Sequence, residues 1–173
     1  MPRIMFIHRS LLWSSRKSYR ILLGMFFVAL SFQLNAQSQR DSIADSLVII
    51  AKAELGTPYK WATSKPGVSF DCSGFTSYVY GYFDITGCRS SKGYGNLGTK
   101  VELKDATIGD CMVFSGTAPG STTIGHVGIV IQNDEDGLKF IHCSSSSKHF
   151  GVVITDYYSS GYTKRFMEVR RLF

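Results

Sequence analysis

The sequence predicts an α+β fold in which N-terminal helices pack on a mostly antiparallel β-sheet. Segments with helical spacing of apolar residues come first, at about 42–55 and 72–82. Segments with strand composition come later, at 111–114, 127–131, 138–143, 152–155 and 166–171. Helices followed by consecutive strands favour one antiparallel sheet over alternating βαβ units.

The first 36 residues resemble an export leader rather than part of this fold. They contain five basic residues and no acidic ones, followed by 14 mostly apolar residues from Ile21 to Leu34. About 20 apolar residues are needed to span a bilayer, so a secretory signal peptide is favoured over an uncleaved membrane anchor. We expect cleavage after Ala36, with 37–173 forming a single domain exported to the periplasm or cell envelope. The membrane is then a partner only through the leader.

The net charge of +6 for the whole chain is therefore misleading, because residues 37–173 carry a net charge of only +1. No Lys/Arg-rich stripe remains in that segment to bind phosphates, so we expect no nucleic-acid partner. The sequence gives no indication of the oligomeric state.

The first helix of the domain is capped by Asp41 or Ser42 and ends at Gly56. The second helix begins near Cys72, where a loop turns into an apolar-faced segment. A thiol at a helix start lies near unpaired backbone N–H groups and the positive end of the helix dipole, which favours the nucleophilic thiolate. The alternative is that Cys72 is a small buried core residue.

A nucleophilic cysteine needs a base and a group that orients the base. His126 opens one predicted strand and His142 closes the next, and the turn cluster 133–137 joins the two strands into a hairpin. A three- or five-residue loop would place the two imidazoles directly opposite each other, and a four-residue loop would place Cys143 opposite His126. Each histidine could instead be a hydrogen-bonded structural residue.

The cysteines and histidines show none of the short paired spacings of a zinc site, so we expect no metal and no cofactor. The segment Gly93–Gly98 satisfies G-x-G-x-x-G, but no strand precedes it and no helix follows, so we interpret it as a flexible loop. Cys72 must be a free thiol to react, and we expect no structural disulfide among Cys88, Cys111 and Cys143.

Five segments together resemble the NlpC-type papain-like cysteine peptidases of bacterial cell walls. They are 56–61 (GTPYKW), 70–74 (FDCSG), 108–114 (IGDCMVF), 125–130 (GHVGIV) and 140–144 (FIHCS), and the resemblance extends from about Ala44 to Arg171. The chain departs from the family pattern after Trp61, where Ala62 and Thr63 replace the usual glycine, and at Cys111 and Cys143.

This resemblance implies a papain-like fold and a peptidoglycan endopeptidase that cleaves a bond in the stem peptide or cross-link. It assigns Cys72 as the nucleophile, His126 as the base and acid, and His142 as the residue that orients the base. It also implies that Tyr59, Asp71 and Ser73 contact the stem peptide, although Tyr59 could be a core residue and Asp71 or Ser73 a helix cap. With histidine as the third member, we expect the rate to be sensitive near pH 6–7, because free histidine titrates at about 6.5. Alternatives are an amidase that cuts between sugar and peptide, a non-catalytic wall-binding protein of the same fold, and an acyltransferase.

Overall fold

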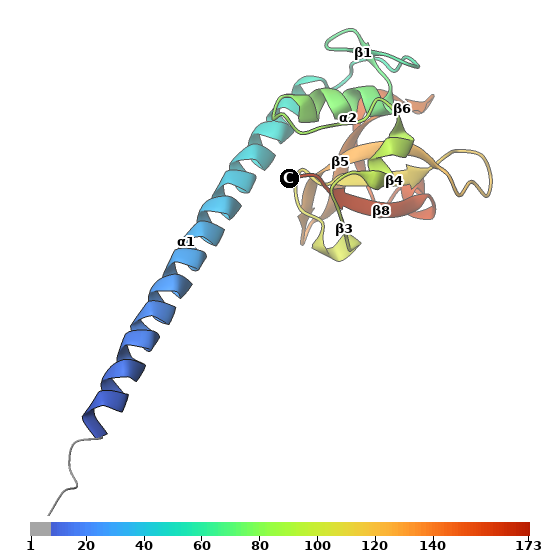
Figure 1. The fold of residues 1–173 in the computed structure, drawn as a ribbon. Coiled ribbons are helices and arrows are strands. Elements are labelled where there is room, and N and C mark those ends of the chain that lie inside the picture. Colours follow the sequence, from blue (N-terminus) through green and yellow to red (C-terminus); the bar gives the residue numbers. More distant parts are fainter. Residues whose placement is uncertain (1–7) are drawn as a thin grey trace, which may run out of the picture. The chain divides into compact units, whose positions relative to one another are not determined.

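The computed structural model describes residues 8–173, which divide into two units, 8–41 and 42–173 (Figure 1). The described part of the first unit is entirely helical and belongs to α1 (His8–Ala53). Among its apolar side chains, Phe26, Phe27 and Phe32 are exposed. Arg3 and the rest of 1–7, at the start of the predicted leader, lie outside the described residues. Cleavage after Ala36 stays a prediction.

None of the helices described in 8–173 combines the length and apolar character needed to cross a membrane.

The second unit begins within α1, whose last turns bury Leu47 and Ala51. The helix ends at Ala53, and Gly56 follows with a positive φ of 85°. This glycine confirms the predicted stop, because a left-handed conformation after a helix favours glycine. The predicted start at Asp41 or Ser42 was wrong, since α1 runs through both residues without a break. Helix-favouring Leu and Ala residues lie on both sides of this point and explain the continuity.

Helix α2 (Cys72–Gly81) confirms the second predicted helix. It is preceded by a small antiparallel pair of strands, β1 (Ser64–Lys65) and β2 (Ser69–Phe70). Asp71 occupies the N-cap in an extended conformation, and its side chain accepts a hydrogen bond from the backbone N–H of Gly74 at 2.6 Å. This cap fixes the position at which the helix starts, and so the position of Cys72.

Six strands form the main sheet, and every neighbouring pair is antiparallel. The spatial order is β3-β8-β4-β5-β6-β7. The strands are β3 (Thr99–Val101), β4 (Cys111–Ser115), β5 (Ile124–Asp134), β6 (Gly137–Ser146), β7 (His149–Asp156) and β8 (Phe166–Arg171). The five predicted strands are therefore confirmed, each within a few residues of its expected ends. Helices on an antiparallel sheet confirm the predicted α+β class.

Short 3₁₀ turns complete the unit: η1 (Ser91–Asn96), η2 (Leu103–Asp105) and η3 (Gly161–Lys164). The G-x-G-x-x-G segment lies mostly in η1, without the strand and helix that a dinucleotide site requires. It is a loop element, as predicted.

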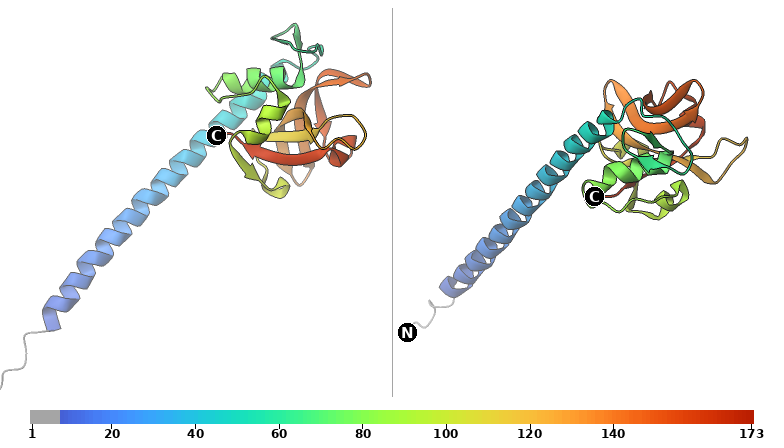
Figure 2. Two further views of the ribbon diagram at one scale, coloured as in Figure 1. Left: turned by 45° about the vertical axis from the view of Figure 1, so that its right-hand side comes forward. Right: turned by 90° about the horizontal axis from the view of Figure 1, so that it is seen from above.

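The sheet carries a hydrophobic cluster on each face. On one face Val127, Ile129 and Ile141 pack with Leu47 of α1 and Phe75 of α2. Figure 2 shows α2 lying along this face. The cluster on the other face has Met112, Phe114, Val130, Phe140 and Val169 as members. Since alternate residues of a strand point to opposite faces, residues 126, 128 and 130 of β5 share the second face.

Candidate active site

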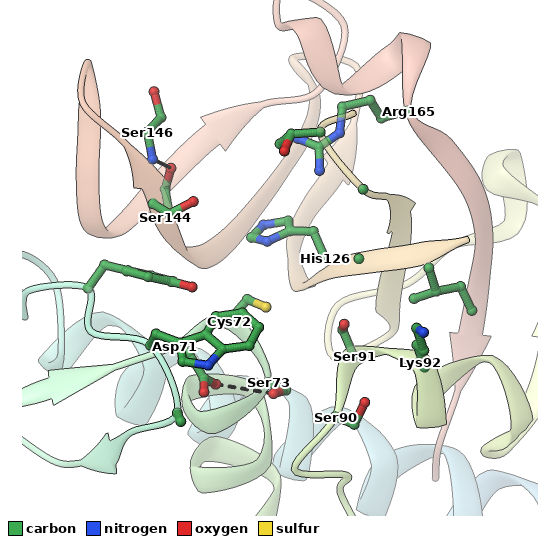
Figure 3. Close-up of a pocket in the computed structure, with 18 of the residues that line it drawn as sticks. Asp71, Cys72, Ser73, Ser90, Ser91, Lys92, His126, Ser144, Ser146 and Arg165 are labelled. Atoms are coloured by element: carbon green, nitrogen blue, oxygen red, sulfur yellow. Dashed lines mark hydrogen bonds between the residues drawn. The ribbon is translucent and has the colours of Figure 1, made fainter. Parts of the chain in front are cut away.

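Cys72 is the first residue of α2, and its side chain is buried at the floor of a pocket (Figure 3). The residue is 9% exposed. The backbone N–H groups of Ser73, Val127 and Cys72 itself are close enough to the sulfur to lower the pKa of the thiol. The helix start thus supplies the N–H donors that the sequence predicted there.

Burial nevertheless dominates the thiol. Burial and the nearby Asp71 carboxylate raise the pKa of Cys72 above its ordinary value, despite the opposing backbone N–H groups. The backbone N–H groups at the helix start favour the thiolate as expected, but burial and the Asp71 carboxylate outweigh them. The helix dipole and the N–H donors stabilise the thiolate by less than its desolvation costs.

His126 lies across the pocket from Cys72 (Figure 3). His142 is hydrogen-bonded to the ring of His126 on the side away from the pocket. The distance from His126 Nε2 to His142 Nδ1 is 2.9 Å. His142 is 1% exposed, and its ring stacks on Phe140 with centroids 4.7 Å apart. Its Nε2 lies 2.9 Å from Oγ1 of Thr155. The three side chains form a continuous hydrogen-bonded series, which leaves Nδ1 of His126 for the pocket.

The register of the β5–β6 hairpin differs from every loop length considered in the sequence. Asp134 pairs with Gly137, so the turn has only two residues, and the register shifts between Val130 and Gln132. Beyond this irregularity Ile129 pairs with Ile141. This register places His142 opposite Gly128, one diagonal step from His126 on the same face. A Cβ at Gly128 would lie 3.0 Å from the His142 Cβ, so the glycine leaves room for the imidazole.

The surroundings of both imidazoles favour their neutral forms. Burial, followed by the charge of Arg165, lowers the pKa of His126 to about 3. Burial also lowers the pKa of His142 well below its ordinary value, with smaller contributions from His126, Arg165 and His149. A neutral His126 can accept a proton. The neutral state does not support the predicted rate sensitivity near pH 6–7.

Asp71 and Ser73 flank Cys72 and line the pocket, but both are held by protein partners. Arg89 donates from Nη1 and Nη2 to the two carboxylate oxygens of Asp71, at 3.0 Å each. Although burial opposes it, this pairing holds the pKa of Asp71 below its usual value. The Ser73 hydroxyl lies 3.0 Å from the carbonyl oxygen of Arg89 and 3.1 Å from Asp71 Oδ1.

Tyr59 also lines the pocket, with its ring edge-on to Phe150. Burial, with Cys72 and Asp71 nearby, raises the pKa of Tyr59 to about 12, so it presents a neutral phenol. The pocket has a volume of about 800 Å³. It brings together five of the six residues singled out in the sequence, and His142 lies directly behind His126.

All four cysteines are free thiols. Within the described part of the chain, no three His, Cys, Asp or Glu side chains are grouped as a metal site would require.

Sequence reasoning missed three residues at this site. Arg89 lies in a polar loop 18 residues after its partner Asp71, Thr155 lies on β7, and Arg165 follows η3. Only the alternation of β7, which places Thr155 on the same face as Val153, offered a hint.

A cysteine at the start of a helix, facing a histidine on a packed antiparallel sheet, is the arrangement of the papain-like class. The NlpC/P60 family description matches residues 56–171. The probable peptidoglycan endopeptidase LytE of Bacillus subtilis is 35% identical over 126 residues, which cover 72% of this chain and 33% of LytE. The chain therefore belongs to the NlpC/P60 family, which confirms the resemblance.

Solved structures support the same fold. An NlpC/P60 family protein from Bacillus cereus superposes with a TM-score of 0.64 at 32% identity, covering 75% of this chain and 40% of that one. RipD from Mycobacterium tuberculosis, described as a non-catalytic domain adapted to peptidoglycan binding, gives a TM-score of 0.56 at 19% identity, covering 76% and 98%. The chain spans only 18% to 33% of the length of the first three curated relatives.

Proposed function

We propose that this protein is a peptidoglycan endopeptidase that cleaves an amide bond in the stem peptide or cross-link through an acyl-enzyme on Cys72. The observation that carries the proposal is the placement of the Cys72 thiol in one pocket with His126, whose far nitrogen is hydrogen-bonded to His142. The name of the relative LytE, a probable peptidoglycan endopeptidase, supports the substrate class.

In the proposed first step, Nδ1 of His126 accepts the thiol proton as the sulfur attacks the amide carbonyl. The carbon–sulfur bond forms and the carbonyl electrons move to oxygen, where the backbone N–H of Cys72 stabilises the negative charge. The intermediate collapses, the carbon–nitrogen bond breaks, and the imidazolium of His126 gives its proton to the leaving amine. Water, deprotonated by His126, then hydrolyses the thioester and regenerates the thiol.

The pKa shifts of Cys72 and His126 determine at which step the proton moves from the thiol to the imidazole. The raised pKa of the Cys72 thiol and the lowered pKa of His126 favour a neutral pair before substrate binds. Proton transfer therefore accompanies attack on the carbonyl and does not precede it. Each ion that forms is stabilised by the other in a buried site, where opposite charges interact strongly.

His142 orients the base and does not contact substrate. If Nε2 of His126 carries a proton and donates it to Nδ1 of His142, then Nε2 of His142 donates to Thr155. That tautomer leaves Nδ1 of His126 unprotonated and able to act as the base. We propose that Tyr59 contacts the stem peptide directly. We propose that Asp71 and Ser73 lie beside the peptide but serve mainly a structural role. Asp71 caps α2, and both residues hold Arg89 in place.

Each rival function differs from the endopeptidase in one respect. RipD is described as non-catalytic, which makes a binding role on this fold a real alternative, but this chain has the cysteine and both histidines. An amidase would use the same cysteine and histidines on a different bond of the same polymer. An acyltransferase would need to bind an acceptor that reacts with the thioester in place of water.

We also propose that the protein acts outside the cytoplasm, after removal of residues 1–36. The basic segment followed by 14 mostly apolar residues supports an export leader, and a wall substrate lies in the same compartment.

Digestion of defined muropeptides, with products identified by mass, tests this function. We expect the protein to release two peptide fragments, and Cys72→Ala to reduce the rate by about 10³-fold or more. Cys88→Ala is the matched control, because Cys88 lies outside the pocket lining. Release of intact stem peptide from the sugar would establish the amidase instead. Binding of muropeptides without cleavage would establish the non-catalytic role.

A further inference from the structure

Arg165 is a pocket-lining cation that the proposed mechanism does not use. It follows η3, and its backbone is fixed by hydrogen bonds to Ser115 and Tyr162. Its guanidinium donates from Nε and Nη2 to the Ser115 carbonyl oxygen, at 3.1 and 2.6 Å. The guanidinium carbon lies 5.2 Å from the centroid of the Tyr162 ring. The side chain is therefore held in place rather than free to swing into solvent.

No carboxylate of the described residues neutralises this cation. In residues 8–173, the ion pairs join Arg89 with Asp71, Lys100 and Arg170 with Glu168, and Arg171 with Asp110. Asp71, the acidic residue that lines the pocket, is already paired with Arg89. A half-buried, immobilised guanidinium without a counter-charge is costly, because its charge is partly removed from water.

An unneutralised charge on Arg165 also opposes the proposed chemistry. Its charge is a cause, after burial, of the lowered pKa of both His126 and His142. An imidazolium must form on His126 during attack by the thiol, and a neighbouring unpaired cation disfavours it. Figure 3 shows the Arg165 guanidinium and the Cys72 thiol on opposite sides of the His126 ring. An anion bound to Arg165 would remove this repulsion.

We propose that Arg165 binds a substrate carboxylate adjacent to the scissile amide. The proposal rests on the proposed function and deepens it, since it makes a free carboxylate in the stem peptide a specificity determinant. A guanidinium has five N–H groups, and the Ser115 carbonyl takes one from each of two nitrogens, so N–H groups remain for a planar acceptor. Carboxylates match this planar geometry and form charge-assisted hydrogen bonds with it.

Binding of this carboxylate then couples recognition to catalysis. It neutralises Arg165 next to His126, so the imidazolium forms more easily when the correct substrate is present. A substrate with a carboxamide at the same position would keep its shape but leave Arg165 unpaired. Discrimination should therefore appear in kcat/KM.

The test compares three synthetic stem peptides: one with free carboxylates, one amidated on the acyl side of the scissile bond, and one amidated on the leaving-amine side. Arg165→Gln should lower kcat/KM for the free peptide by about 10- to 100-fold, the range of a charge-assisted hydrogen bond. For one of the two amidated peptides, Arg165→Gln should be no slower than the unaltered protein, because no carboxylate contact is lost and the unpaired charge beside His126 is removed. That peptide identifies which carboxylate Arg165 binds. Arg165→Lys should retain part of the preference for the free peptide, because the charge remains.

Lys164→Gln is the matched control, because it removes the same charge one residue away and Lys164 is not among the pocket-lining residues. It should leave the three rates unchanged. An equal loss with all three peptides in Arg165→Gln, or no loss with any, would overturn the proposal. Circular dichroism and the thermal midpoint of each variant identify losses that come from misfolding.

Binding measurements separate this proposal from the proposed function. Calorimetry on Cys72→Ala requires no turnover. Adding Arg165→Gln to it should weaken binding of the free peptide and of the amidated peptide that keeps the recognised carboxylate, and leave binding of the other amidated peptide unchanged. If the protein cleaves no peptide but shows this carboxylate-dependent binding, the endopeptidase function fails and the Arg165 site stands. If it cleaves all three peptides equally well and binds them equally, the Arg165 site fails and the function stands.

Discussion

Nε2 of His126 lies 2.9 Å from Nδ1 of His142, although the two residues are diagonal and not directly opposed across the β5–β6 hairpin. The two-residue turn at 135–136 and the register shift near residue 131 produce this offset. The diagonal brings ring nitrogens together edge to face, with an interplanar angle of 89°. As a result, Nε2 of His126 is hydrogen-bonded to His142, and Nδ1 of His126 faces the pocket.

His142→Ala should lower kcat/KM by about 100-fold or more, because His126 then loses the hydrogen bond that fixes its tautomer and orientation. The measurement is steady-state hydrolysis of a stem peptide. His149→Ala is the control: His149 is exposed and does not line the pocket. Equal activity in His142→Ala and His149→Ala would contradict the orienting role.

Thr155→Val should lower kcat/KM by about 2- to 10-fold, the value of one neutral hydrogen bond. Valine keeps the shape of threonine but offers no acceptor to Nε2 of His142, so the series His126–His142–Thr155 is cut at its far end. Thr155→Ser should restore most of the activity, because it restores the hydroxyl. A merely structural role would show itself as an equal loss in the serine and valine variants.

The pH profile of kcat/KM should be flat between about pH 5 and 8. Burial and Arg165 lower the pKa of His126 to about 3, so the base stays neutral over this range. The charged and titratable groups around His126 also keep their protonation states over this range. They are Cys72, His142, Tyr162 and Arg165. The pKa values of the Cys72 thiol and the Tyr162 phenol are raised, and the pKa of His142 is lowered. A fall in kcat/KM with an apparent pKa near 6.5, which reports the free protein, would show that His126 is solvated instead.

Folding stability should fall as the pH falls from about 6.5 towards 3. In the unfolded chain His126 and His142 take up protons near pH 6.5, whereas in the folded protein their lowered pKa values keep them neutral. The unfolded state then binds more protons, so each histidine costs up to about 1.4 kcal/mol of stability per pH unit below 6.5. The stability is fully present above pH 6.5.

Urea unfolding at several pH values between 4.5 and 7.5 measures this slope. The double variant His126→Asn/His142→Gln should show a much shallower dependence. His149→Gln, which alters an exposed histidine, should keep the full slope. An unchanged slope in the double variant would mean that other groups control the acid lability.

The sequence was sufficient for the order of elements, the helix start at Cys72 and the two hairpin histidines, because these depend on local patterns. It could not specify the hairpin register, since one irregularity near residue 131 changes every pairing beyond it. It also missed the neutral thiol and imidazole. Those states depend on burial, and burial is created by Phe114, Phe140 and Tyr162 packing around the histidines from other strands and turns.

The Asp71–Arg89 pair and the Arg165 site were invisible for a related reason. Their residues come from separate loops and turns, and no spacing rule connects them. Asp71 illustrates the consequence. The resemblance implies that Asp71 contacts the substrate. In the structure its carboxylate accepts hydrogen bonds from Arg89 and from the backbone N–H of Gly74 at the N-terminus of α2.

The most direct test of the central claim is the mass of the protein quenched with acid during turnover of a stem peptide. We expect a population heavier by the mass of the acyl fragment, with the added mass located on the peptide that contains Cys72 and absent from Cys72→Ala. Cleavage at the normal rate in Cys72→Ala, or an adduct on another residue, would contradict the account.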